Sequence, residues 1–172
     1  MGSFWQLSVD AGRWALRFYL HHWPLVLGLS LVPTVQRFLS IRYADRLPAA
    51  VGVAGEVVTA GARVLLVYLV LRIMVSEAGL AGLSVGQRWQ LFGQGVDARM
   101  RDFLLQFLVL GIAFVLFDVI PEGAVALWTP EERRPLATAI LIGVKNPTVI
   151  AMTMLWMIGV GRALLTVPPP AP

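Results

Sequence analysis

Four ionisable residues lie inside long apolar stretches of this chain: Glu56, Arg63, Asp118 and Lys145. A charge in the middle of a lipid bilayer is costly unless it is paired or hydrated. If these stretches cross a membrane, each of the four residues is a candidate for proton or ion chemistry.

Glu56 and Arg63 form the first candidate site. They are seven residues apart, which is two helical turns, so they share one face of a helix. An Arg side chain leans toward the N-terminus of its helix, which predicts that Arg63 points at Glu56. The pair either lines a polar cavity or fixes the register of two helices, and the sequence favours the second role.

Asp118 and the segment Lys145-Asn146-Pro147 are two further candidates, and the sequence does not connect them. Asp118 lies three residues before Pro121, which indicates a capping or inter-helix role near the outer interface rather than titration. Pro147 removes a backbone donor and frees a carbonyl near Gly143, and that carbonyl needs another partner. A helix broken in this way lines the substrate site of some transporters. A kink or hairpin at the membrane surface is the simpler interpretation.

Other site chemistry is not indicated. His21 and His22 are the two His residues of the chain and point about 100° apart on a helix, so we expect them at the interface beside Trp23. The chain has no Cys, and it carries no phosphate-binding, nucleophile-elbow or zinc-protease motif. We therefore expect no metal, no cofactor and no catalytic residue, and the protein is not predicted to be an enzyme.

The composition explains why the embedded charges matter. Hydrophobic residues make up 58% of the 172 residues and charged residues 14%, against about 45–50% and about 25% in soluble domains. The mean hydropathy is +0.74. This number of charges cannot cover the surface of a soluble domain of this size. We therefore predict an all-α integral membrane bundle. The net charge of +4 comes from scattered Arg residues rather than a basic run, which argues against a nucleic-acid partner.

Five helices are expected to position the candidate residues within one helical membrane domain, residues 1–166. Residues 3–20 predict an amphipathic helix in the membrane interface. Four transmembrane helices follow at about residues 23–41, 49–75, 103–120 and 137–165, and Pro121 is expected to end the third. The first contains Pro33 and has few uninterrupted apolar residues, but a span is favoured over a re-entrant segment. Residues 167–172 form a Pro-rich tail that cannot be helical.

The connections between the predicted spans differ in length. Residues 76–102 form the longest one and are expected to contain a short interfacial helix near residues 85–92.

Aromatic and basic residues near the ends of apolar stretches are expected to anchor the chain at the interfaces: Trp5, Arg13, Trp14, Arg17, Trp23 and Trp128. The Arg residues favour the side of the termini by seven to five. This predicts a multi-pass protein of a bacterial plasma (inner) membrane with both termini inside.

One function leads and two others remain open. Small-residue faces suited to helix packing, little extramembrane mass and no catalytic motif favour a non-catalytic accessory or scaffold subunit of a larger plasma-membrane assembly. Its partners would be membrane lipids and other membrane subunits, in a hetero- or homo-oligomer. The first alternative is a small oligomeric transporter or channel that uses Glu56, Arg63, Asp118, Lys145, Asn146 and Pro147. A weaker alternative is a lipid-modifying enzyme with its site in residues 76–102.

Overall fold

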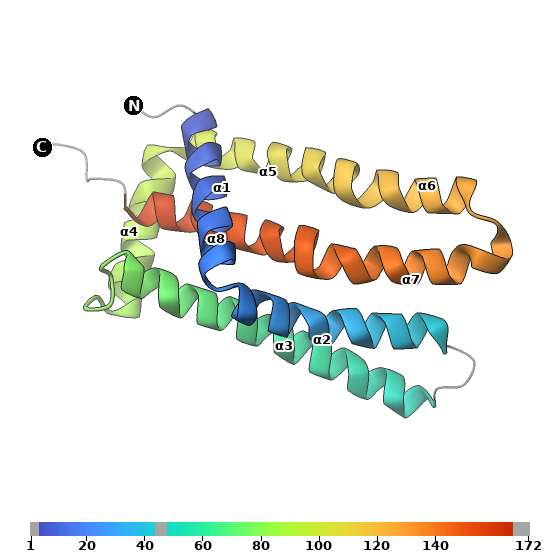
Figure 1. The fold of residues 1–172 in the computed structure, drawn as a ribbon. Coiled ribbons are helices and arrows are strands. Elements are labelled where there is room, and N and C mark those ends of the chain that lie inside the picture. Colours follow the sequence, from blue (N-terminus) through green and yellow to red (C-terminus); the bar gives the residue numbers. More distant parts are fainter. Residues whose placement is uncertain (1–3, 44–47, 167–172) are drawn as a thin grey trace, which may run out of the picture.

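The structure is a computed structural model, and it describes residues 4–43 and 48–166. Every regular element in these two ranges is a helix, and the longest helices run side by side as an elongated bundle (Figure 1). The predicted all-α fold class is confirmed. The predicted Pro-rich tail, residues 167–172, lies outside the described residues.

Four helices are long and apolar enough to cross a membrane: Trp23–Arg42, Ala50–Glu77, Met100–Trp128 and Glu131–Leu165. This supports the expectation of a multi-pass membrane protein with four spans. The first is α2 (Trp23–Arg42), whose 20 residues include Pro33 inside the helix. The second lies within α3 (Ala49–Glu77).

The third span is longer than the sequence predicts. It consists of α5 (Met100–Phe114), a π-helical segment η1 (Val115–Val119) and α6 (Ile120–Trp128). Pro121 was expected to end this helix, and that prediction is wrong. In η1 the Ile120 N–H donates to the carbonyl of Val115, five residues back. This wider turn accommodates a residue that lacks a backbone donor, so the helix continues past the proline.

The fourth span follows a short turn and begins with a 3₁₀ segment, η2 (Glu131–Arg133). It contains α7 (Arg134–Lys145), a second π-helical segment η3 (Asn146–Ile150) and α8 (Ala151–Leu165). The break predicted at residues 143–147 is therefore neither a hairpin nor the end of a helix. Pro147 lies in η3, and the helix runs on in the same direction through it (Figure 1).

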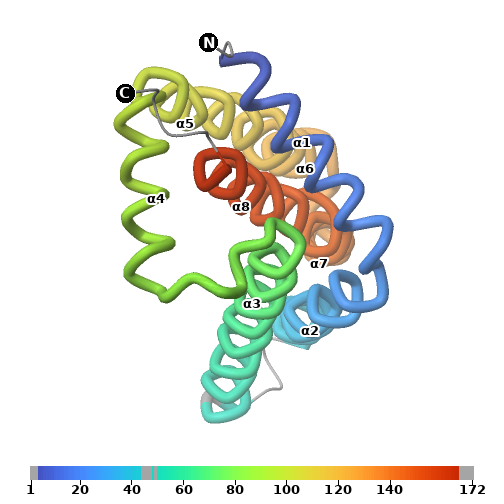
Figure 2. Tube along the Cα trace, turned by 90° about the vertical axis from the view of Figure 1, so that its left-hand side faces the viewer, coloured from blue at the N-terminus to red at the C-terminus, as the bar shows by residue number. Residues whose placement is uncertain are grey.

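Two helices cross the bundle at one end instead of running along it (Figure 1). These are α1 (Phe4–His21) and α4 (Val85–Ala98). Seen from that end, they lie on opposite sides of α8 (Figure 2). The helix expected near residues 85–92 is present and extends to Ala98. It begins at a capping box in which Ser84 and Gln87 each accept a hydrogen bond from the other's backbone N–H.

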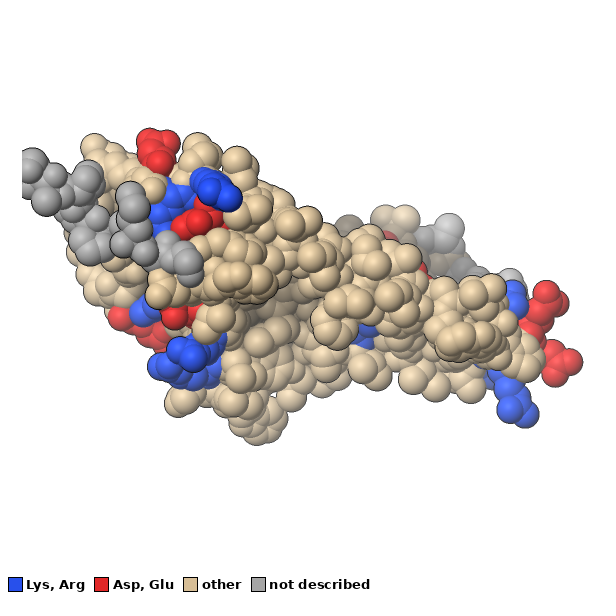
Figure 3. Space-filling model, turned by 90° about the horizontal axis from the view of Figure 1, so that it is seen from above, with Lys and Arg blue, Asp and Glu red and all other residues tan. Residues whose placement is uncertain are grey.

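The core lies where α1 meets α8. On α1, the buried residues Leu7, Ala11, Ala15 and Phe18 form the apolar stripe that the helical spacing predicted. They pack with residues of α8, including Leu155, Val160 and Leu164. The charged side chains seen from above gather mainly at the two ends of a long apolar body (Figure 3). That distribution is typical of a protein whose middle lies in lipid.

Candidate functional site

The most buried ionisable side chain among the described residues belongs to Lys145, at the end of α7. Its side chain is 7% exposed. The Lys145 Nζ forms an ion pair with Asp118 of η1 and a second one with Glu122 of α6, at 2.8 Å from Glu122 Oε1. We call Lys145, Asp118 and Glu122 the charged cluster. Asp118 thus takes part in an inter-helix contact, and it does so next to a lysine that the sequence analysis treated separately.

Local structure explains how the charged cluster forms. Asp118 and Glu122 are close in sequence on one helix, and the turn at Thr129 and Pro130 brings α7 back antiparallel against α6. Asp118 lies in η1 and Lys145 immediately precedes η3, so both π-helical segments adjoin the cluster. Such segments occur frequently at functional sites. Three charges with an excess of one carboxylate therefore meet where two helices depart from regular geometry.

Hydroxyl groups from three helices satisfy the carbonyls around η3. The Thr34 Oγ1 lies 3.3 Å from the Gly143 carbonyl, the one that Pro147 was predicted to free, and 2.9 Å from that of Ser30. The Thr148 hydroxyl donates to Val144, in a bond of 2.6 Å. These contacts give carbonyls around the irregular turn hydroxyl partners within the chain.

Tyr19 of α1 completes this set. Its hydroxyl donates to the Pro147 carbonyl over 2.8 Å. Burial raises the pKa of the Tyr19 hydroxyl, so it stays protonated and able to donate. Neither Tyr19 nor Thr34 was predicted as a site residue, because the spacing of residues along a helix does not indicate which distant segment they face.

Arg63 and Asn146 form a second polar group beside the charged cluster. Arg63 is at the middle of the span Ala50–Glu77, and its Nη2 donates to Asn146 Oδ1 over 3.5 Å. Asn146 is buried, and its Nδ2 has no hydrogen-bond partner among the described residues. A void of about 10 Å³ adjoins both side chains, which is close to the volume that one water needs. We call Arg63 and Asn146 the donor site, because it combines a guanidinium with a buried amide N–H that lacks an acceptor.

The predicted pair of Glu56 and Arg63 is wrong. Glu56 pairs instead with Arg37 of α2, with Oε1 at 3.1 Å from Nη1, and it also accepts from Gln36 at 3.3 Å. Both partners in this ion pair are about half exposed, at 45% and 50% of the side chain. Glu56 does share a helix with Arg63, but rotation of α3 against α2 decides which charges meet.

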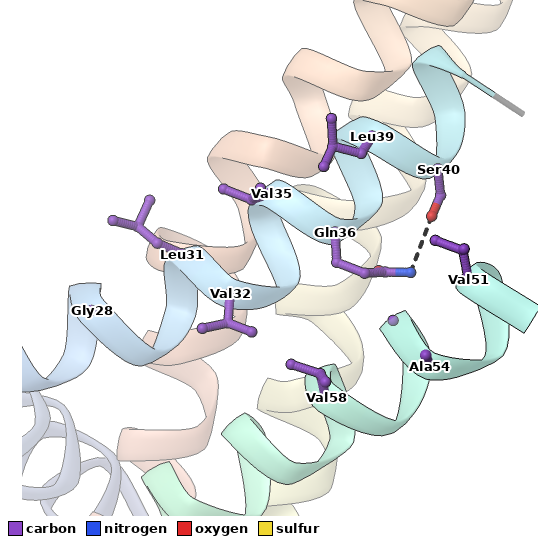
Figure 4. Close-up of a pocket in the computed structure, with 11 residues that line it drawn as sticks. Gly28, Leu31, Val32, Val35, Gln36, Leu39, Ser40, Val51, Ala54 and Val58 are labelled. Carbon is purple, nitrogen blue, oxygen red and sulfur yellow. Dashed lines mark hydrogen bonds between the residues drawn. The ribbon is translucent and has the colours of Figure 1, made fainter. Parts of the chain in front are cut away.

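An apolar groove and a polar pocket lie outside the charged cluster. One is an open apolar groove of about 620 Å³ between α2 and α3. Val32, Val35 and Val58 line it, and the Gln36 side chain donates to Ser40, one turn further along the same helix (Figure 4). The other is a polar pocket of about 430 Å³ at the end of the bundle that carries α1. Of the residues that line the polar pocket, the sequence had indicated Arg13, Trp14 and Arg17 as interfacial anchors.

The remaining candidates are the two His residues and the Trp residues that were predicted at the interface. The Nδ1 atoms of His21 and His22 lie 2.9 and 3.2 Å from carbonyls four residues earlier in the helix. Trp5, Trp23 and Trp128 are exposed at 68%, 56% and 83%, whereas Trp14 is partly buried against the core. No group of three or more potential metal ligands occurs in residues 4–43 and 48–166.

Comparison with known proteins adds no relative. No protein-family model matches the chain, and no curated protein or solved structure is detectably similar to it. Its function must therefore be argued from the geometry above.

Proposed function

We propose that this protein is a non-catalytic accessory or scaffold subunit of a larger membrane assembly. The observation that carries the proposal is the low burial of the third span. Only 6% of its 18-residue apolar segment is buried against the rest of the chain, whereas the share is 28% for the second and fourth spans. In lipid, helices associate through close packing and polar contacts rather than through the hydrophobic effect. A span with so little intramolecular packing has most of its surface available to another subunit.

The contacts of the third span support this role. It touches the rest of the chain mainly near its ends, where α5 meets α1 and α6 meets α7. At one end Gln106 is buried, and its Oε1 accepts from the Ser8 hydroxyl at 2.9 Å. At the other end Asp118 and Glu122 join Lys145. The span is thereby fixed in place while its large apolar residues between these contacts stay exposed, including Phe107, Leu108, Ile112 and Phe114.

The chain itself permits a sharp test, because it contains no Cys and accepts a single labelling site. A photoactivatable cross-linker attached to an Ile112→Cys variant in cells should give one discrete adduct with a different membrane protein. Val64→Cys is the matched control, since Val64 is 69% exposed on α3 and should react with lipid alone. The proposal fails if neither position gives a protein adduct, or if the purified chain stays monomeric and transports a solute alone.

A second candidate function is a small oligomeric transporter or channel, and the donor site favours it. Arg63 is at the middle of its span and has no carboxylate within 4.0 Å among the described residues. A single guanidinium without a carboxylate partner at that depth is costly, and it lies beside the Asn146 amide N–H that lacks an acceptor. A water molecule in the adjoining void would supply the missing acceptor.

Flux into liposomes tests this candidate. Arg63→Gln should abolish or strongly reduce flux, whereas Arg37→Gln, which removes a half-exposed charge outside the donor site, should not. No flux from the unmodified chain, or equal flux from all three proteins, would remove the donor site from any transport path. A cross-link from Ile112 to a second copy of this chain would favour this function over the first.

The membrane placement belongs to the same proposal. We place α1 in the membrane interface because it crosses the direction of the spans at one end of the bundle (Figure 1). That end also carries the larger Arg group, which favours a cytoplasmic position in a bacterial plasma membrane. A reporter that folds only in the cytoplasm, fused after Pro172, should therefore be active. An inactive reporter, together with an active periplasmic one, would reverse the orientation.

A further inference from the structure

The polar pocket at the end of the bundle brings together four guanidinium groups from three separate parts of the chain. Arg13 and Arg17 come from α1, Arg99 from the junction of α4 and α5, and Arg162 from the last turn of α8. We call this the arginine pocket. Asp10 and Trp14 also line it, and its volume is about 430 Å³.

The sequence of α1 sets which way its two Arg residues face. Leu7, Ala11 and Phe18 are buried against the bundle. Trp5, Val9, Leu16 and Leu20 are exposed and, at 100° per residue, lie together on a different side of the helix. Arg13 and Arg17, four residues apart, occupy the sector between these two apolar sides. The charged sector of α1 therefore adjoins the ends of α5 and α8.

The charges in the arginine pocket do not balance internally. Asp10, Asp102 and Glu77, whose Oε2 accepts from Trp14 at 3.3 Å, oppose the four Arg residues. Among these Arg residues only Arg99 has a carboxylate within ion-pair distance in the described part of the chain, Asp102 Oδ2 at 3.2 Å from its Nη2. The Nε of Arg162 is buried and has no hydrogen-bond partner there. An excess of positive charge with an unused buried donor calls for an anionic acceptor.

Arg88, at the same end of the bundle, shows the contrast. Its guanidinium donates to the carbonyls of Leu80, Ala81 and Leu83, at 3.2, 3.4 and 2.6 Å. Arg88 is therefore used to hold the loop between α3 and α4. Arg13, Arg17 and Arg162 have no comparable acceptors in residues 4–43 and 48–166.

The position of the pocket indicates what the anion is. The third candidate span begins at Met100 and the fourth ends at Leu165, so Arg99 and Arg162 lie at the ends of two adjacent spans. This is the level of phospholipid headgroups. The planar fork of a guanidinium matches two oxygens of a phosphate, and basic pockets at helix ends bind phospholipid headgroups.

We propose that the arginine pocket binds a phosphate group. Two sources share this chemistry: the headgroup of an anionic phospholipid and a soluble phosphate ester. The proposal rests on the membrane placement proposed above but not on the accessory-subunit role, because it needs no partner subunit.

Lipid binding to the full-length protein in mild detergent tests the proposal. Native mass spectrometry would compare phosphatidylglycerol, phosphatidylcholine and glycerol 3-phosphate as probes. We expect phosphatidylglycerol to bind about tenfold more tightly than phosphatidylcholine, and each Arg removed from the pocket to weaken it about fivefold. The variants are Arg17→Gln, on an exposed position of α1, and Arg162→Gln. If glycerol 3-phosphate competes equally with phosphatidylglycerol, the pocket takes a soluble ligand.

Arg101→Gln is the matched control. Arg101 is exposed at the same end of the bundle but does not line the pocket, so its removal should leave phosphatidylglycerol binding unchanged. Equal losses in Arg101→Gln and Arg162→Gln would show a diffuse charge effect and overturn the proposal. So would the absence of any preference for phosphatidylglycerol over phosphatidylcholine when glycerol 3-phosphate also fails to bind. Arg17→Gln keeps the test valid if Arg162→Gln does not fold.

Discussion

Two helix contacts in this protein are built on different principles. Where α1 and α4 meet α8, small residues let backbones touch: a Cβ at Gly159 would lie 2.8 Å from the Ala11 carbonyl oxygen, and one at Gly95 would overlap the Leu164 carbonyl oxygen. Where α6 meets α7, the charged cluster joins the helices instead. The first contact depends on shape and tolerates no added volume. The second depends on charge balance and leaves the neighbouring apolar residues exposed.

The difference explains which part of the molecule is available for partners. Close backbone approach removes surface from lipid, so the surfaces at which α1 and α4 contact α8 are not available to another subunit. An ion cluster fixes the position of a helix at a few atoms and leaves the rest of its surface uncovered. The third span can therefore be held in register and still offer a packing face to another subunit.

The largest expected effect comes from breaking the charge contact with Lys145→Met. The change leaves Asp118 and Glu122 close together without a cation, and removing one partner of a buried ion pair costs about 3 kcal/mol or more. The carboxylates are 30% and 52% exposed, so we expect the lower end. Thermal unfolding in detergent measures the loss.

A triple variant is the control for this prediction. Lys145→Met combined with Asp118→Asn and Glu122→Gln removes the unbalanced charges and should recover most of the lost stability. If Lys145→Met alone unfolds at the same temperature as the unmodified protein, the charged cluster does not hold α6 to α7.

Gly95→Ala tests the contact that depends on shape and should cost about 2 kcal/mol, because the new methyl group overlaps backbone that no rotamer change can move. Gly93→Ala is the control on the same helix, since a Cβ there has nothing within 4 Å. It should gain up to about 1 kcal/mol from helix propensity. Opposite shifts in unfolding temperature confirm the close approach, and equal shifts contradict it.

Tyr19→Phe tests a contact between α1 and the irregular turn η3, because the Tyr19 hydroxyl donates to the Pro147 carbonyl. Its loss should cost about 1 kcal/mol, as other inter-helix hydrogen bonds in membrane proteins do. Tyr68→Phe is the control, since Tyr68 is 57% exposed. A decrease in unfolding temperature for Tyr68→Phe as large as that for Tyr19→Phe would show that Tyr19 does not support η3.

The smallest effect is expected for Arg37→Gln. The ion pair between Arg37 and Glu56 is about half exposed, and such pairs contribute about 0.5 kcal/mol or less. The comparison with Lys145→Met then measures how much burial adds to an ion pair in this chain. A loss for Arg37→Gln as large as that for Lys145→Met would mean that α2 and α3 are also joined mainly by charge.

Several structural features were predictable from the sequence because they are local. The buried stripe of α1 follows from helical spacing, and the free carbonyl at Gly143 follows from the chemistry of Pro147. The end of the third span was mispredicted because a proline ends a helix only if the wider turn is unavailable. At Pro121 the π-helical segment η1 provides that turn.

The partners of the candidate residues could not be predicted in the same way. Glu56 and Arg63 share a helix, but their partners come from α2 and from η3. Lys145 and Asp118 were both recognised as unusual, and only the antiparallel packing of α6 and α7 brings them together. An ion pair between helices depends on which helices are neighbours and how each is rotated, and neither quantity is encoded in the spacing along one helix.

By itself, the sequence determined an all-helical chain with four apolar stretches that hold few charges, because hydrophobicity and length act within each segment. It also determined which ionisable residues lie within those stretches. The tertiary structure alone decided that Lys145 is neutralised within the chain, that Arg63 faces an amide rather than a carboxylate, and that four Arg residues form one pocket. The reason is that an electrostatic contact falls off over a few ångströms, so its partner is set by packing between distant segments.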